Sequence, residues 1–436
     1  MLTLYQHQKM MLSLLRAHDA FAIFAEQGTG KTLPVLMRIS ELLESGKAQD
    51  ALVVCPKAVM GSWVRDIEKL DPDGKTLLRD RVTVINYDRV WRKSTNLKLS
   101  WDVIVLDESH MIKSHAARRT KCVLTLAMYS KYRYILTGTP ISNGQLENIF
   151  SQFAFLHPKQ GYRDNVYCTL FGSYYDWLGR YALLNKYHQP YRYQHVDELQ
   201  TIIHNNSFRV KKCECLDLPD KLPDEVWEIE LTPDVKKLYK KLMKGAIEEL
   251  DVLAKNPLAK MTKLRQMCSG QIEGEPVDCE KITALRDFLD AHGERKLAIF
   301  CSFRNSIDAV VAVLEDKKLG HVVLDGRQPD KTIWKRFQTD PAIQVIVCQY
   351  QSANAGIDLF AADTMLFYEP TLSSNVLEQT KDRIHRIGQH QPCSYIHFLT
   401  KGTIEKEIYR ALRGYSDFGE KLFTEYITAY QKGFQK

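Results

Sequence analysis

The sequence predicts an α/β protein made of two tandem lobes, each built on a parallel β-sheet, with helical insertions. Short apolar runs rich in β-branched residues recur between segments of helical length, which is typical of parallel sheets covered on both faces. These runs form two series along the chain. A stretch of different character, rich in tyrosine and punctuated by proline, separates them at about 157–275.

The predicted strands define the lobes. In the first series they lie at 21–25, 51–54, 82–85, 103–106 and 134–136. In the second series they lie at 297–301, 321–324, 344–348, 364–368 and 394–399. We therefore predict a first lobe over residues 1–156, a helical insertion and connector over 157–275, and a second lobe over 276–436. For the tyrosines of the insertion, packing within a helical subdomain is the favoured role and base stacking is the alternative.

Composition excludes several classes of protein. The chain has 436 residues, of which 44% are hydrophobic and 26% charged, unlike disordered or collagenous chains. It lacks an apolar run of about 18 residues, as a membrane helix requires, and its start lacks the order of a signal peptide. We therefore expect no membrane partner and a cytoplasmic location. The ten cysteines include no CxxC pair, which favours reduced thiols. The net charge of +7 permits a polyanionic partner.

A phosphate-binding loop is predicted directly after the run at 21–25. The loop consists of Gly28, Thr29, Gly30, Lys31 and Thr32. Strand, glycine loop, Lys-Thr and helix form the context of a P-loop, in which backbone N–H groups surround phosphate oxygens. Lys31 would contact the β- and γ-phosphates, and the Thr32 hydroxyl would ligate Mg²⁺. The alternative is a glycine-rich loop that binds no phosphate.

An acidic pair, Asp107 and Glu108, follows the apolar run at 103–106. Two adjacent carboxylates after a buried strand repel each other unless a cation or base neutralises them. We expect Asp107 to hold Mg²⁺ and Glu108 to orient or activate the attacking water. The alternative is a solvated acidic turn. Because both halves of a nucleotide site occur in order in one lobe, the sequence predicts hydrolysis of ATP.

Together these motifs resemble the SWI/SNF-type ATPases, a DNA-translocase branch of the superfamily-two helicases. Further stretches that resemble the motifs of this family are Tyr5-Gln6, 54–57, Trp63, 107–110, Lys113, 136–140, 264–268, 299–303, 324–326, 356–359, 361–363 and 379–389. The resemblance covers about residues 1–415 and implies two RecA-like lobes. The Asp-Glu-Ser-His spelling at 107–110 is closer to fork-remodelling and strand-annealing members, whereas 351–354 departs from the family pattern.

The resemblance also assigns roles to single residues. It implies that Gln6 reads adenine, that Gly356 and Asp358 belong to the nucleotide site, and that Arg383 and Arg386 are arginine fingers. Arginine suits the last role because it stays charged and binds phosphate oxygens with two donors. The alternative for the pair is contact with the DNA backbone or a surface position.

Four residues are candidates for contact with nucleic acid: Lys57, Lys113, Ser302 and Arg304. For each of the charged candidates, Lys57, Lys113 and Arg304, the alternative is an ordinary solvated surface residue. The predicted function is an ATP-dependent DNA translocase or helicase that remodels forks or junctions, by branch migration, in replication, recombination or repair. Three alternatives remain: a conventional helicase that separates strands of DNA or RNA, a DNA-binding module without activity, and the motor subunit of a restriction or remodelling complex.

Overall fold

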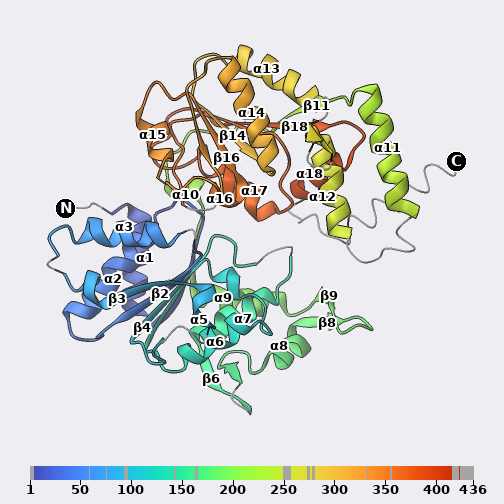
Figure 1. Cartoon of the computed structure of the whole chain (residues 1–436). Coiled ribbons are helices and arrows are strands. Elements are labelled where there is room, and N and C mark those ends of the chain that lie inside the picture. Colours follow the sequence, from blue (N-terminus) through green and yellow to red (C-terminus); the bar gives the residue numbers. More distant parts are fainter. Residues whose placement is uncertain are drawn as a thin grey trace. The chain divides into compact units, whose positions relative to one another are not determined.

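The computed structural model describes residues 4–57, 59–74, 76–92, 97–141, 144–162, 165–248, 257–272, 275–276, 280–330, 332–353, 356–414 and 422. The chain divides into two compact units, Met1–Asp217 and Leu218–Lys436. Each unit holds one six-stranded sheet, and every strand pair described in these two sheets is parallel (Figure 1). The predicted fold class, two parallel-sheet α/β lobes with helices, is therefore confirmed.

The first unit orders its strands β10-β1-β5-β4-β2-β3. These strands are β1 (Ala20–Ala25), β2 (Ala51–Cys55), β3 (Val82–Asn86), β4 (Val103–Asp107), β5 (Tyr132–Leu136) and β10 (Ser207–Val210). Two antiparallel hairpins are added, β6 (Pro158–Gln160) with β7 (Val166–Cys168) and β8 (Ala182–Leu184) with β9 (Pro190–Tyr193). The helices are α1 (Gln6–Ala17), α2 (Thr32–Glu44), α3 (Met60–Leu70), α4 (Leu78–Arg81), α5 (Tyr87–Val90), η1 (Ser109–Ile112), α6 (Arg118–Ala127), α7 (Asn148–Leu156), α8 (Tyr174–Tyr181), α9 (Val196–Asn205) and α10 (Lys212–Cys215).

The second unit orders its strands β11-β18-β17-β14-β16-β15. These strands are β11 (Glu225–Ile229), β14 (Leu297–Cys301), β15 (His321–Leu324), β16 (Val345–Gln349), β17 (Thr364–Phe367) and β18 (Ser394–Thr400). A short hairpin, β12 (Gln271–Ile272) with β13 (Glu275–Pro276), lies outside the sheet. The helices are α11 (Pro233–Glu248), α12 (Pro257–Cys268), α13 (Glu280–His292), α14 (Arg304–Asp316), α15 (Trp334–Thr339), α16 (Tyr350–Ala353), α17 (Ser374–Lys381) and α18 (Ile404–Arg413).

Each sheet separates two hydrophobic cores, as the continuous apolar runs require. In β1, Phe21 and Ile23 pack into one core while Ala22 and Phe24 pack into the other. The same alternation occurs in the second unit, where Phe300 and its strand neighbours at 297, 299 and 301 lie on opposite faces. Successive side chains of a strand point to opposite faces, so a strand buried on both faces must be apolar throughout.

The segment 157–275 contributes to both units. Its strand β10 pairs with β1 at the edge of the first sheet, whereas β11, near 225, pairs with β18 at the edge of the second. The segment also contains the hairpins and helices α8 and α9. Because β10 and β11 are short edge strands with polar residues, neither shows the continuous apolar run that identifies the central strands.

Two expectations drawn from composition can be compared with the structure. No helix in the described part of the chain is long and apolar enough to span a membrane. Of the nine cysteines that the structure describes, six are buried. The tenth, Cys279, lies outside the described residues.

Candidate active site

The glycine loop closes tightly at the end of β1. Gly28 and Gly30 adopt φ angles of 81° and 74°, in the left-handed region that glycine enters without strain. The Thr29 hydroxyl donates to Glu26 O at 2.7 Å, and Lys31 Nζ donates to Ala25 O at 2.7 Å. Helix α2 begins directly after Lys31, so its N-terminal N–H groups and positive field lie at the loop. The five predicted loop residues therefore form one cradle of the kind that binds phosphate.

Helix α1 supports this loop through two side chains that the sequence analysis missed. His7 Nε2 lies 2.8 Å from Thr29 O, and Gln8 Nε2 donates to Gly30 O at 3.0 Å. A Cβ added to Gly30 would lie 2.4 Å from Gln8 Nε2, so the end of the Gln8 side chain would have to move and this contact with the loop would be disturbed. The contacts link residues 22 positions apart, and local sequence spacing carries no signal for them.

Gln6, the predicted adenine-reading residue, is exposed at the first position of α1. It lies in the wall of a surface pocket of about 530 Å³. Other residues lining this pocket are His7, Met10, Phe208, Cys213 and Leu216. His7 lines this pocket and also contacts the glycine loop, because its ring lies against Thr29 O.

The acidic pair sits where β4 ends. Trp63 Nε1 donates to Asp107 Oδ2 at 2.8 Å, and the hydroxyl of Tyr87 donates to Asp107 O at 2.9 Å. Glu108 adopts φ 52° and ψ 53°, a left-handed conformation that costs a non-glycine residue about 1–3 kcal/mol. Its backbone N–H donates to Asp107 Oδ1 at 3.0 Å. The strained turn holds both carboxylates at the carboxyl edge of the sheet.

The pKa values of the two carboxyl groups are shifted in opposite directions. Burial and the neighbouring Glu108 raise the pKa of Asp107 to about 6. Burial also acts to raise the pKa of Glu108, but His110 and Lys31 outweigh it and lower that pKa to about 2. Lys31 lowers both pKa values, so the structure brings the P-loop lysine and the acidic pair together. A buried carboxylate beside a second one is a group that a divalent cation stabilises, which fits Mg²⁺ at Asp107.

Neighbouring loops orient Glu108. Gln27 Nε2 donates to Glu108 Oε1 at 3.0 Å, and Thr137 Oγ1 donates to Glu108 Oε2 at 3.4 Å. His110 Nδ1 lies 3.2 Å from Thr137 Oγ1 and 3.3 Å from Glu108 Oε2. The backbone N–H of Thr139 donates to Thr137 Oγ1 at 3.1 Å. The loop after β5 is therefore connected to the acidic pair by hydrogen bonds.

In the second unit, the predicted arginines lie against the loop that precedes β17. Arg386 Nη1 donates to Ile357 O at 2.9 Å and forms an ion pair with Asp358. The backbone N–H of Leu359 donates to Arg383 O at 2.9 Å, and the Arg383 side chain is buried. Gly356 has a φ angle of 64°. The structure therefore places Gly356, Asp358, Arg383 and Arg386 within one region of this unit.

Three of the four predicted nucleic-acid contacts follow strand ends, and the fourth, Lys113, follows a short helix. Lys57 follows β2 and Lys113 follows η1 in the first unit, and both are exposed. Ser302 and Arg304 follow β14 in the second unit, where Arg304 is exposed and Ser302 is half-buried. The carboxyl ends of parallel strands are where open α/β sheets bind their ligands.

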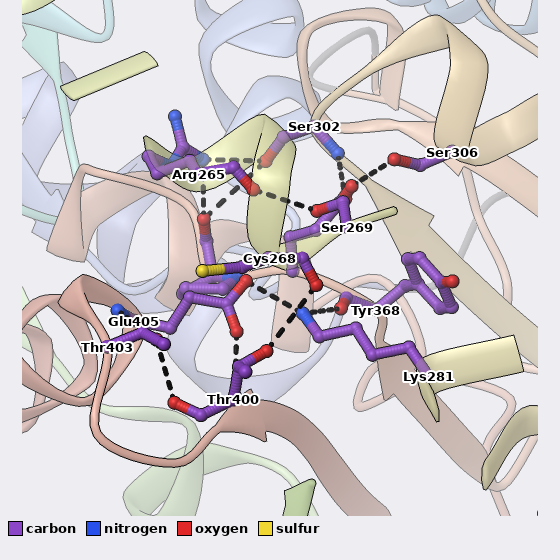
Figure 2. Close-up of polar contacts among 12 residues, drawn as sticks. Arg265, Cys268, Ser269, Lys281, Ser302, Ser306, Tyr368, Thr400, Thr403 and Glu405 are labelled. Atoms are coloured by element: carbon purple, nitrogen blue, oxygen red, sulfur yellow. Dashed lines mark hydrogen bonds and ion pairs between the residues drawn. The ribbon is translucent and has the colours of Figure 1, made fainter. Parts of the chain in front are cut away.

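A buried polar network holds the Ser302 loop (Figure 2). Arg265 Nη2 donates to Ser302 Oγ at 3.0 Å and to Pro370 O at 2.7 Å. The Ser302 N–H donates to Glu369 Oε2 at 2.7 Å, and Ser306 Oγ donates to the other oxygen of that carboxylate. Burial raises the pKa of Glu369. Because both sides of the loop are fixed, Ser302 is presented by a rigid scaffold.

The network continues to a fully buried ion pair. Lys281 Nζ donates to Glu405 Oε1 at 2.7 Å and to Tyr368 O at 3.0 Å. The remaining oxygen of Glu405 accepts the Thr400 N–H at 2.8 Å. Figure 2 shows Lys281, Thr400 and Glu405 directed toward one another. The pair joins α13 to α18, and its two residues, Lys281 and Glu405, lie 124 positions apart in the sequence.

Two family models and several known proteins are similar to this chain. The model of the SNF2-related domain matches residues 5–272, and that of the helicase conserved C-terminal domain matches residues 280–388. An uncharacterized ATP-dependent helicase of Mycoplasma genitalium is 24% identical over 93% of this chain and 40% of its own length. The DNA annealing helicase and endonuclease ZRANB3 of Mus musculus is 24% identical over 91% of this chain and 38% of its own length. The chain therefore spans about two fifths of these relatives.

Among solved structures, the Sulfolobus solfataricus SWI2/SNF2 ATPase core in complex with dsDNA is 24% identical, with a TM-score of 0.46, over 98% of this chain and 93% of that one. The family resemblance drawn from the motifs is confirmed by the family models, because the SNF2-related model alone spans more than half of the 436 residues. The chain belongs to the SNF2-related domain family, and its second part matches the helicase conserved C-terminal domain.

Proposed function

We propose that this chain is an ATP-driven translocase that moves on duplex DNA and remodels forks or junctions. The observation that carries the proposal is that the glycine loop and the acidic pair lie together: Gln27, next to Gly28, donates to Glu108 Oε1 at 3.0 Å, and Lys31 lowers the pKa of both carboxyl groups. A phosphate cradle next to a buried acidic pair is the arrangement needed to hydrolyse a nucleoside triphosphate. Similarity to ZRANB3, whose name describes an annealing helicase, supports fork remodelling as the task.

In this proposal, Lys31 and the backbone of residues 28–30 hold the β- and γ-phosphates. Thr32 and Asp107 are the residues that would hold Mg²⁺, which supplies charge neutralisation on the phosphate oxygens. Glu108 stays ionised because His110 and Lys31 lower its pKa, so it can accept a proton from the attacking water or orient that water. Gln27 and Thr137 fix its direction.

Arg383 and Arg386 act as the arginine fingers of the proposal. Arg386 would leave its ion pair with Asp358 and bind a phosphate oxygen instead. This is feasible because a guanidinium binds a carboxylate or a phosphate with two parallel donors. In the proposal, Gly356 and Asp358 belong to the nucleotide site because they lie next to Arg386 before the exchange. Gln6 would recognise the adenine from the wall of its pocket.

Contact with DNA is assigned to Lys57, Lys113, Ser302 and Arg304. A motor that steps along DNA must bind without regard to sequence, and contacts to phosphate oxygens carry no sequence information. The Ser302 loop suits this role because Arg265 and Glu369 hold it rigidly.

The proposal predicts that duplex DNA stimulates ATP hydrolysis more than single-stranded DNA or RNA does. The experiment measures ATP hydrolysis across a panel of blunt duplex, fork, four-way junction, single-stranded DNA and RNA. The K31A variant is expected to lose hydrolysis with every nucleic acid in the panel. A rate that is equal across the panel would contradict the proposal, and stimulation by RNA or single strands alone would favour a conventional helicase.

A further inference from the structure

The hairpin formed by β8 and β9 presents exposed tyrosines that the proposed motor does not use. Tyr187 is 68% exposed and Tyr191 is 65% exposed, whereas Trp177 and Tyr181 at the base of the hairpin are buried. Figure 1 shows the hairpin extending beyond α8, away from the sheet of its own unit. Packing, the role favoured for these tyrosines on sequence grounds, therefore applies to the base of the hairpin and not to its tip.

The tip has a defined shape. The Asn185 side chain accepts the N–H of Tyr187 at 2.9 Å and that of Gln189 at 3.1 Å. The Asn185 N–H donates to Gln189 O at 2.9 Å, and His188 adopts the left-handed region with a φ angle of 58°. These contacts close the turn from within. A turn that is already ordered loses little conformational entropy when a ligand binds.

Every charged residue between positions 177 and 196 is basic. Residues 177–196 include Arg180, Lys186 and Arg192 and contain no Asp or Glu. Lys186 Nζ lies 5.0 Å from the centre of the Tyr187 ring, so charge and aromatic face are presented together.

Two carboxylates from outside this stretch reach its base, and both already accept hydrogen bonds. Tyr193 donates to Glu147, while Arg180 and Tyr181 donate to Glu198 at 2.7 Å. Both carboxylates lie at the base of the hairpin, whereas the tip at 185–189 carries Lys186 and no acidic residue. An anionic partner with flat apolar groups matches this surface.

We propose that the β8–β9 hairpin binds unpaired bases of DNA, with Tyr187 and Tyr191 stacking on bases and with Lys186 and Arg192 contacting phosphates. Aromatic rings combined with cations form the usual surface for single-stranded nucleic acid, because every base offers a π-face. The inference rests on the proposed function, since it gives a duplex motor a means to recognise the open strands of a fork.

The test compares the affinity of the whole chain for a fork with single-stranded arms and for a blunt duplex, by fluorescence anisotropy. The Y187A/Y191A variant is expected to bind the fork about tenfold more weakly, or weaker still, with its affinity for the blunt duplex unchanged. The Y187W/Y191W variant is expected to retain the preference for forks, because tryptophan also stacks. Y129A is the matched control, since Tyr129 is 59% exposed and lies outside the hairpin.

Equal affinity of Y187A/Y191A and the unmodified chain for the fork would overturn the assignment and point to a protein partner for the hairpin. An equal loss on fork and blunt duplex would overturn it as well, because a blunt duplex offers no unpaired bases. Hydrolysis of ATP stimulated by blunt duplex is measured in parallel. If duplex DNA does not stimulate hydrolysis by the unmodified chain, the proposed motor is contradicted. If stimulation is normal but the preference for forks does not depend on the hairpin, only the role proposed for the hairpin is contradicted.

Discussion

Replacing Glu108 by glutamine is expected to lower kcat for ATP hydrolysis by about 10²–10⁴-fold while nucleotide still binds. Glutamine keeps an oxygen that can accept from Gln27 but cannot take a proton from water. His110 and Lys31 lower the pKa of Glu108, which keeps this carboxylate ionised and able to accept a proton. The measurement combines steady-state kinetics with direct titration of a fluorescent ATP analogue.

The matched control is Glu44→Gln, because Glu44 is an exposed carboxylate on α2 that accepts a hydrogen bond from Ser40. This control is expected to retain both kcat and affinity. Two results would count against the role given to Glu108: an unchanged kcat in E108Q, or a loss of nucleotide affinity as large as the loss of kcat.

Replacing Lys281 by methionine is expected to lower the free energy of unfolding by about 3–5 kcal/mol. Lys281 is fully buried, and its loss leaves the Glu405 carboxylate without a cation in an apolar interior. The loss also removes the donor to Tyr368 O. Denaturant unfolding followed by circular dichroism measures the change.

The double variant K281M/E405Q provides the control for this prediction. Glutamine at 405 is neutral and still offers an oxygen to the Thr400 N–H, so the uncompensated charge disappears. The double variant is therefore expected to be more stable than K281M alone. If both variants unfold at the denaturant concentration of the unmodified chain, the ion pair contributes nothing and the interpretation of Figure 2 as a stabilising network is wrong.

The central strands and the nucleotide motifs could be predicted from the sequence because their signals are local. Continuous apolar runs mark β1, β4 and β14, since a strand buried on both faces has no polar position. The glycines at 28 and 30 identify their loop because few other residues adopt the observed φ angles.

The supporting contacts could not be predicted because they join distant parts of the chain. Trp63 contacts Asp107 across 44 positions, and Gln27 contacts Glu108 across 81. Lys281 sits in a helix whose charged residues would suit solvent, and only the folded unit shows that its partner is Glu405. The role of the tyrosines also depended on the fold, since exposure separates Tyr187 from the buried Tyr181.

The central claim is that ATP turnover moves this chain along a DNA duplex. The most direct test is whether the chain displaces the third strand of triplex DNA. The unmodified chain is expected to release the third strand when ATP is present, and K31A is expected to leave it bound. A third strand that stays in place while the unmodified chain hydrolyses ATP in response to duplex DNA would contradict translocation.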